Sequence, residues 1–398
     1  MKKEDVMERD NISQKSSSLA YFIVFVLSVV FIISGYLICK PEAKSGSTEV
    51  KIYPAKVVDV YNKIESSYSL EGEGNQVKQE LILFVAQFIG DYKKGEKVEA
   101  VQKIDQLYYY QPQEVKNGDK VLLSFSSETD EGEWTYIEHN RIAPLIALVS
   151  FFLLLILIIG RKKGFNTIVS LIFTVAAIFV VYIPSILKGY NIYLSTIIIS
   201  VFIILMSLII INGINMKTLC AVLGNIGGIV IAGLFAIIMN KILHITGLMD
   251  DDFVLLKLLN EKNPIDLKAI IWGSIVIGSL GAIMDVAMSI ASAMNELSDT
   301  MKNKSFSRLL KSGMNIGKDA IGTMTNTLIL AYIGGALATV LLIVANNKNI
   351  LYLFNLEVIM VELVQAIVGS IGILVAVPVT ALLSAKIYNI SKSSIKLE

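Results

Sequence analysis

The sequence predicts a polytopic α-helical membrane protein with a small all-β domain between its first and second spans. Of the 398 residues, 54% are hydrophobic and only 17% are charged, which is too apolar for an ordinary soluble protein. About eight apolar segments have the roughly twenty residues that an α-helix needs to cross a bilayer. Between the first two of them lies a long stretch with strand-like composition.

The chain begins with a polar segment, residues 1–18, which we expect to be a cytoplasmic N-terminal tail. The apolar run 19–39 is longer than the core of a signal peptide and has no small-residue cleavage site, so we interpret it as an uncleaved first span. Cys39 and Cys220 fall in different spans, near opposite membrane faces. They are therefore expected to be small buried residues without a disulfide between them.

Residues 40–140 have the composition of an extracytoplasmic β domain. Stretches rich in β-branched and aromatic residues alternate with turns rich in Gly, Asn and Glu. The predicted strands are 50–61, 76–88, 97–110, 120–125 and 134–138. We expect an antiparallel barrel or a sandwich. Its sparse chemistry leaves two interpretations open, a stable extramembrane cap and a module that binds an extracytoplasmic partner protein.

The membrane core is predicted at residues 141–388, followed by a cytoplasmic tail at 389–398. Its spans are expected at about 142–160, 165–187, 192–212, 217–239, 269–293, 319–345 and 359–385. Lys and Arg are more frequent in alternate loops, which predicts that both termini lie in the cytoplasm of a multi-pass plasma-membrane protein.

Two loops have distinct chemistry. Asp250, Asp251 and Asp252 form an acidic triplet that would either attract cations or cap a helix, and we favour the cap. The segment 294–319 is basic and amphipathic, which predicts a short helix along the inner membrane surface around Phe306 and Leu310.

The segment from Trp272 to Glu296 is long and apolar enough to span, yet small and polar residues recur in it at steps of four and three. At about 100° per residue these positions share one helix face. They are Ser274, Gly278, Gly281, Asp285, Ser289, Ser292 and Glu296. A carboxylate near mid-membrane costs about 2.5–3.5 kcal/mol, so Asp285 should face protein, water or an ion. The face is either part of a functional pathway or a packing seam with Asp285 protonated or paired.

Similar faces occur in other C-terminal spans, whereas spans two to four are plainer. Their polar members are Asn225 in the fifth span, Asp319, Thr323 and Asn326 in the seventh, and Glu362 in the eighth. Small residues beside them predict close helix packing. The predicted packing positions are Gly224, Gly228, Gly278, Gly281, Gly334 and Gly369. The C-terminal half is therefore the predicted working half.

Several functions are disfavoured by composition. The formal net charge is only +1, which gives no bulk basic character for nucleic-acid binding, and the two His make no metal cluster. The sequence contains no G-x-x-x-x-G-K-[ST] loop for nucleotide phosphates. We therefore expect no nucleic-acid partner, no metal site and no cofactor, with the lipid bilayer as the surroundings.

Two long motifs carry a family resemblance. The stretches GSLGAIMDVAMSIASAMNEL at 278–297 and IGKDAIGTMTNTLILAYIGG at 316–335 resemble the YibE/F-like family of bacterial multispan membrane proteins. The order of an anchor, a β segment and a membrane core is also similar to that family. The resemblance implies a transporter or permease without an established substrate, and it supplies no catalytic residues.

Three functions remain open. The favoured one is a secondary transporter or permease for a small solute or ion, in which Asp285 binds a proton or cation and Ser289, Ser292, Thr323 and Asn326 supply neutral ligands. The second is a scaffold or sensor whose outer β domain recruits an extracytoplasmic partner protein; formation of a homo-oligomer also stays open. The third is an intramembrane aspartyl hydrolase using Asp285 and Asp319. We disfavour an enzyme because Asp319 is expected at the membrane edge and lacks the G-x-G-D pattern.

Overall fold

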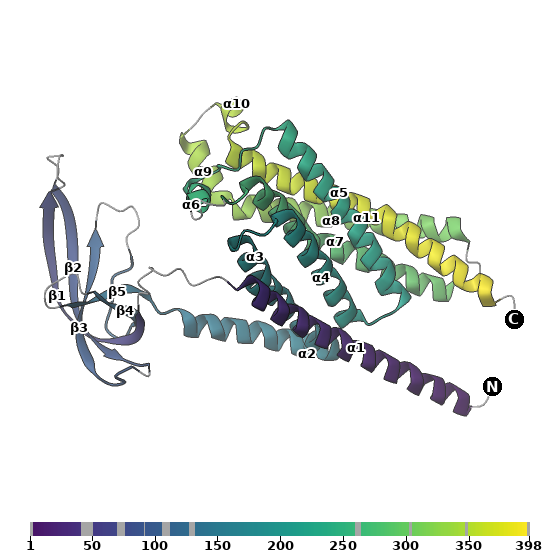
Figure 1. Cartoon of the computed structure of the whole chain (residues 1–398), viewed down its shortest axis with the longest axis horizontal. Coiled ribbons are helices and arrows are strands. Elements are labelled where there is room, and N and C mark those ends of the chain that lie inside the picture. The colour runs from purple at the N-terminus through teal and green to yellow at the C-terminus, as the bar shows by residue number, and fades with distance from the viewer. Residues whose placement is uncertain are drawn as a thin grey trace. The chain divides into compact units, whose positions relative to one another are not determined.

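The computed structural model describes residues 3–40, 51–69, 76–90, 92–105, 112–126, 132–258, 264–301, 305–346 and 349–395. The chain forms two compact units. One contains Ala43–Leu155, and the other contains Met1–Glu42 together with Ile156–Glu398. The first unit is built around a β-barrel and the second is a bundle of apolar helices (Figure 1).

The barrel has five strands, close to the positions predicted for them. They are β1 (Ile52–Ser69), β2 (Gln76–Phe88), β3 (Lys97–Asp105), β4 (Lys120–Ser126) and β5 (Glu133–His139). They close in the order β1-β2-β3-β5-β4, with β3 and β5 parallel and the other neighbours antiparallel. This is the strand order of an OB-fold barrel. The all-β prediction is confirmed, and the structure selects the barrel over the sandwich.

The barrel core follows from alternation along its strands. On β2, Ile82, Phe84, Ala86 and Phe88 are buried at every second position. The long strand β1 pairs with both β2 and β4, and two register shifts let it curve between them. The fully buried Gln102 donates to the Gln113 carbonyl and accepts from the Val115 backbone N–H, each at 2.9 Å. Its amide therefore holds the loop before β4.

The described helices belong to the second unit, except that the start of α2, up to Leu155, belongs to the first. They are α1 (Lys3–Cys39), α2 (Ile142–Ala176), the π-helix η1 (Ala177–Tyr182), α3 (Ile183–Leu187), α4 (Ile192–Asn212), α5 (Met216–Ile242), α6 (Asp251–Leu258), α7 (Leu267–Thr300), α8 (Phe306–Gly335), α9 (Leu337–Asn346), α10 (Ile350–Leu353) and α11 (Glu357–Ile395). In the described part of the chain, six helices are long and apolar enough to cross a membrane, or seven if α8 and α9, bent by 63°, form one span. The multispan prediction is confirmed.

The span count differs from about eight because of residues 142–187. Two predicted spans there form one 46-residue apolar run, Ile142–Leu187. At 1.5 Å per residue a straight helix of that length would be about 70 Å long, roughly twice the hydrocarbon thickness. The backbone leaves the helical region at Arg161, with φ 48° and ψ −122°. A Cβ at Gly164 would collide with the Ile156 carbonyl oxygen, so glycine permits this tight bend.

The seventh predicted span is also displaced. We predicted a surface helix followed by a span at 319–345, whereas α8 runs unbroken from Phe306 and bends after Gly335. Ser305 caps α8 by accepting from the Arg308 backbone N–H. The amphipathic segment is thus the first part of α8. Helix α1 likewise starts at Lys3 within the predicted tail, and α11 continues past residue 388 to Ile395.

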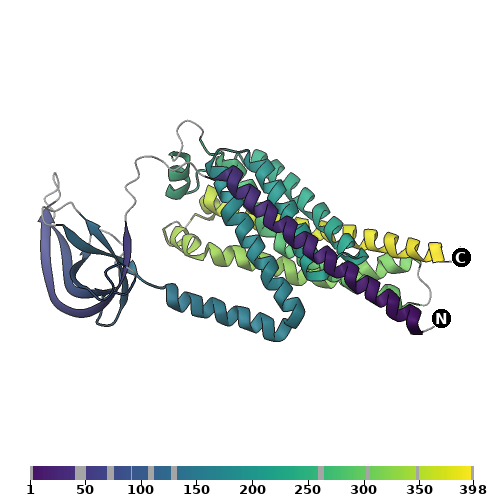
Figure 2. The ribbon, with the colours of Figure 1, turned by 60° about the horizontal axis from the view of Figure 1, so that its bottom comes forward.

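Helix α1 lies along the bundle (Figure 2). Its Phe31 stacks on Phe202 of α4, with ring centroids 4.1 Å apart. Its Phe25 meets Phe173 of α2 edge-on at 5.4 Å. Cys39 and Cys220 are both buried and free, as expected. The first span is therefore a packed member of the helical unit.

Carboxylates hold two loops of this unit in place. Asp250 accepts from the Phe253 backbone N–H at 3.2 Å, and Asp251 and Asp252 occupy the first turn of α6. The cap interpretation of the acidic triplet is confirmed. Glu357, in the first turn of α11, accepts from the Thr246 backbone N–H and hydroxyl, each at 2.8 Å, and from the Gly247 N–H. This ties the loop after α5 to the start of α11.

Candidate functional site

The predicted face of α7 exists and is largely exposed, although Ser274 and Gly278 at its N-terminal end contact α11 and α8. Six of its seven residues are exposed and Ser292 is half-buried; the exposed ones are Ser274, Gly278, Gly281, Asp285, Ser289 and Glu296. The opposite side of α7 is fully buried at Ile283, Ile290 and Met294. Helical periodicity predicted which residues share the face. The structure adds that this face is the exposed side of α7.

The polar residues of α8 are also exposed. Asp319, Thr323 and Asn326 all lie on the surface of the described chain, and Gly334 has open space where a Cβ would lie. Thr323 donates its hydroxyl to the Ala320 carbonyl within its own helix. We call the exposed polar residues of α7 and α8 the polar surface.

A second polar region is buried between α5 and α11, which lie side by side in antiparallel directions (Figure 1). A Cβ at Gly224 would collide with the Thr380 hydroxyl, so the two backbones approach closely there. A Cβ at Gly228 would lie 2.8 Å from the Gly372 carbonyl oxygen. Gly224 and Gly228 thus lie where α5 and α11 approach each other closely.

Asn225 lies at this crossing and is fully buried. Among the described residues, neither its Oδ1 nor its Nδ2 has a hydrogen-bond partner. Thr380 is also fully buried, and its hydroxyl has no partner in the same part of the chain. A buried polar group without a hydrogen-bond partner lowers the stability of the fold by about 1–3 kcal/mol. The presence of these two polar side chains therefore needs a reason other than packing.

A row of polar side chains continues along α11. Ser384 and Tyr388 follow Thr380 at steps of four, which places all three on one helix face. Ser384 is buried beside the Cys220 thiol, and Tyr388 is buried with its hydroxyl unpaired among the described residues. We call Asn225, Thr380, Ser384 and Tyr388 the polar seam. Ser384 and Tyr388 were not among the predicted site residues, although they follow Thr380 at steps of four in the sequence.

Glu362 belongs to a third group, where α7, α8 and α11 meet. Gln365 donates its amide to the Ser274 hydroxyl at 3.3 Å. The Tyr332 hydroxyl is buried where a Cβ on Gly278 would lie, and the half-buried Glu362 is close enough to act on it electrostatically. Further along α11, Gly369 packs against Leu328 and Ser279.

The structure does not gather all the predicted residues in one place. Ile283 of α7 contacts the positions of Gly228 and Gly372, and Asp285 lies two residues, or about 200°, further around the helix. Asp285 therefore points away from the seam that holds Asn225. The polar seam and the polar surface are two separate regions of the core.

The barrel carries one connected cluster of polar side chains. The Tyr136 hydroxyl and His139 Nδ1 are 2.6 Å apart, and His139 Nε2 lies 3.4 Å from Asp119 Oδ2. The Glu138 carboxylate accepts from the His139 backbone N–H at 3.0 Å and from Arg141 at 3.1 Å. These interactions, led by the backbone N–H, hold the pKa of Glu138 below its ordinary value.

A family model described as YibE/F-like protein matches residues 148–390, more than half of the chain. The chain belongs to the YibE/F-like family. Both motifs that carried the resemblance lie inside the matched region. Searches of the curated proteins and of the solved structures found no match.

Some of the candidate regions lie inside the residues that the family model matches, and one lies outside them. The polar seam, the polar surface and the Glu362 group all lie within the part that the YibE/F-like model matches, whereas the barrel strands lie outside it. Among the described residues, no group of three or more His, Cys, Asp or Glu side chains could hold a metal ion. The chemistry of the family region is therefore that of hydroxyls, amides and isolated carboxylates.

Proposed function

We propose that this chain is a secondary transporter or permease for a small solute or ion. The observation that carries the proposal is Asn225, a fully buried amide with both polar atoms unpaired in the described chain. A transported ligand that passes between α5 and α11 would supply the missing partner for part of each cycle. Gly224 and Gly228 let these helices slide or rock against each other without side chains that interlock.

The ligand that suits the polar seam is small and polar. Asn225 offers one acceptor and one donor group, and Thr380 and Ser384 offer hydroxyls that both donate and accept. The seam has no charged side chain, so it would bind a neutral solute, or a cation through neutral oxygens. We place the barrel on the extracytoplasmic side and both termini in the cytoplasm, because Lys and Arg are enriched in the alternate loops that this orientation puts inside.

Asp285 has a different proposed role. Its carboxylate lies on the polar surface, where contact with lipid alone would be costly. We propose that it takes up and releases the coupling proton or cation in a water-accessible path, with Ser289 and Ser292 beside it. A second copy of the chain is the proposed cover for this surface, because Gly281 has open space where a Cβ would lie and so leaves room for another helix.

The test is a flux assay with the full chain in liposomes that contain a pH-sensitive dye. Gradients of Na⁺, K⁺ and Mg²⁺ and a pool of polar metabolites are applied in turn, and dye signal and retained solutes are measured. We expect flux from the wild type and at least a tenfold loss in Asp285→Asn, which keeps the shape but cannot cycle a proton. Asp252→Asn, exposed in the first turn of α6, is the matched control and should retain flux. Full flux in a folded Asp285→Asn protein would remove Asp285 from this role.

A further inference from the structure

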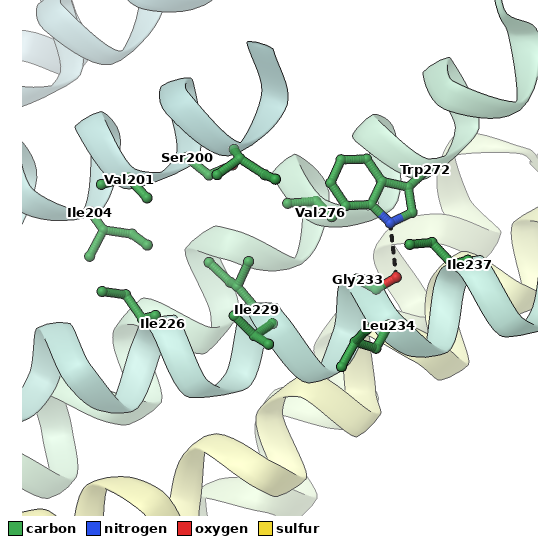
Figure 3. Close-up of a pocket in the computed structure, with 12 residues that line it drawn as sticks. Ser200, Val201, Ile204, Ile226, Ile229, Gly233, Leu234, Ile237, Trp272 and Val276 are labelled. Carbon is green, nitrogen blue, oxygen red and sulfur yellow. Dashed lines mark hydrogen bonds between the residues drawn. The ribbon is translucent and has the colours of Figure 1, made fainter. Parts of the chain in front are cut away.

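A pocket of about 270 Å³ lies between α4, α5 and α7, apart from the polar seam (Figure 3). Twelve residues line it, and none of them is charged. Ser200 supplies the single hydroxyl, and the other walls are Ile, Val, Leu, Gly and Trp. The chemistry of this pocket is that of a hydrocarbon-binding site.

The floor and the rim of the pocket differ in exposure. Ile204, Val276 and Trp272 form a buried floor, whereas Ile197 and Val230 are exposed at the rim. The rim residues belong to α4 and α5, both long and apolar enough to span a membrane, and they lie well inside the helix ends. The mouth of the pocket therefore faces the hydrocarbon interior of the bilayer.

The floor is held in place by a hydrogen bond. Trp272 Nε1 donates to the Gly233 carbonyl at 2.8 Å, the contact drawn dashed in Figure 3. A Cβ at Gly233 would lie 3.3 Å from the Trp272 ring, so glycine allows the indole to lie close against α5. The hydrogen bond fixes the indole of Trp272, and Gly233 lets α5 lie close against it. This part of the pocket wall therefore has a defined shape before any ligand binds.

Water does not suit this pocket. A buried water needs about two to four polar partners, and the pocket offers one hydroxyl, Ser200, which is 2% exposed and unpaired in the described chain. Typical drug-sized ligands need about 300–1,000 Å³, so this space fits a narrower object.

We propose that the pocket holds the end of one acyl chain of a membrane phospholipid, which enters sideways from the bilayer between α4 and α5. The apolar walls match a hydrocarbon chain, and the mouth opens where such chains are the surrounding medium. The bound chain fills the gap between α4 and α5 above the α7 floor. This site is independent of the proposed transport activity.

The test uses the full chain in liposomes of phosphatidylethanolamine and phosphatidylglycerol with a small fraction of phospholipid that carries a diazirine at one acyl end. After illumination, labelled residues are mapped by peptide mass spectrometry. We expect labels on the floor residues of α7. Ile197→Trp narrows the mouth and should lower floor labelling at least fivefold. Ile198→Trp is the matched control, since Ile198 is a similarly exposed neighbour that does not line the pocket.

Ser200→Ala distinguishes a hydrocarbon occupant from a ligand with a hydrogen-bonding head. An acyl chain gains nothing from the hydroxyl, so labelling should stay the same or increase. Loss of labelling in Ser200→Ala would contradict the proposal and indicate a ligand such as a quinone. Unchanged floor labelling in Ile197→Trp would also overturn it. If that variant does not fold, Val230→Trp with the control Ile238→Trp gives the same comparison.

Discussion

At Gly224, two membrane helices approach so closely that any larger side chain would meet the Thr380 hydroxyl and backbone. Helical spacing predicted that the small residues of α5 form a packing face. The structure shows that this face packs against α11. The same spacing could not show that the side chain of Asn225, one residue further, has no hydrogen-bond partner among the described residues. Hydrogen-bond satisfaction depends on what the facing helix presents, and Thr380, Ser384 and Tyr388 come from a span more than 150 residues later in the chain.

Replacing Gly224 by Ala should destabilise the core. The added Cβ overpacks the α5–α11 crossing, at a cost of about 1–3 kcal/mol. The measurement is thermal unfolding of the purified protein in detergent. Gly334→Ala is the control, because its Cβ meets nothing within 4 Å and Ala favours a helix over Gly by up to about 1 kcal/mol. Adding Thr380→Ala to Gly224→Ala should recover part of the loss. Wild-type stability in Gly224→Ala would show that the crossing is looser than described.

For helix α7, the sequence predicted which residues share a face but not the direction in which that face points. Its periodicity correctly placed Asp285 and Ser289 on one face with Glu296, but the face is turned outward because Ile283 and Ile290 occupy the side that packs on α5, α8 and α11. Local composition predicted the positions of all five barrel strands, although β1 continues to Ser69, eight residues past its predicted end. Their order was not predicted, because the pairing of β3 with β5 joins strands far apart in sequence.

The barrel should lose stability in acid through Glu138. Folding lowers the pKa of this carboxyl because the His139 backbone N–H and Arg141 stabilise its charged form. The stabilisation is complete above the ordinary Glu pKa of about 4.3 and is lost as the pH falls through the lower folded value. In a Trp272→Phe background, Trp134 is the one remaining Trp and reports barrel unfolding. Glu138→Gln should flatten the dependence of barrel stability on pH between about 5 and 3. An unchanged dependence would exclude Glu138 as its source.

At the scale of the whole molecule, the barrel and the helical unit are separate compact units, and the family match covers the helical one. Composition alone predicted both units and their order. The predicted count of about eight compares with six or seven in the described chain, because the predicted spans 142–160 and 165–187 form one 46-residue apolar run that is kinked at Arg161. The break at Arg161 lies in the loop that the sequence predicted between these two spans, and its backbone geometry is added by the structure.

Deleting the barrel separates a transporter from a scaffold. With residues 50–138 replaced by a short Gly-Ser linker, the helical unit keeps the polar seam and the polar surface. We expect the deleted protein to insert at normal levels and to retain flux in the liposome assay. Complete loss of flux from a folded, inserted protein would favour the scaffold or sensor alternative.

The most direct test of transport through the polar seam is the flux of Asn225→Leu measured together with its melting temperature. Replacing an unpaired buried amide by an apolar side chain of similar size is neutral or stabilising, whereas replacing a paired one costs about 1–3 kcal/mol. We predict a melting temperature equal to or above that of the wild type and flux reduced at least tenfold, with the exposed Asn346→Leu unchanged in flux. A lower melting temperature with flux preserved would contradict this and make Asn225 a structural residue.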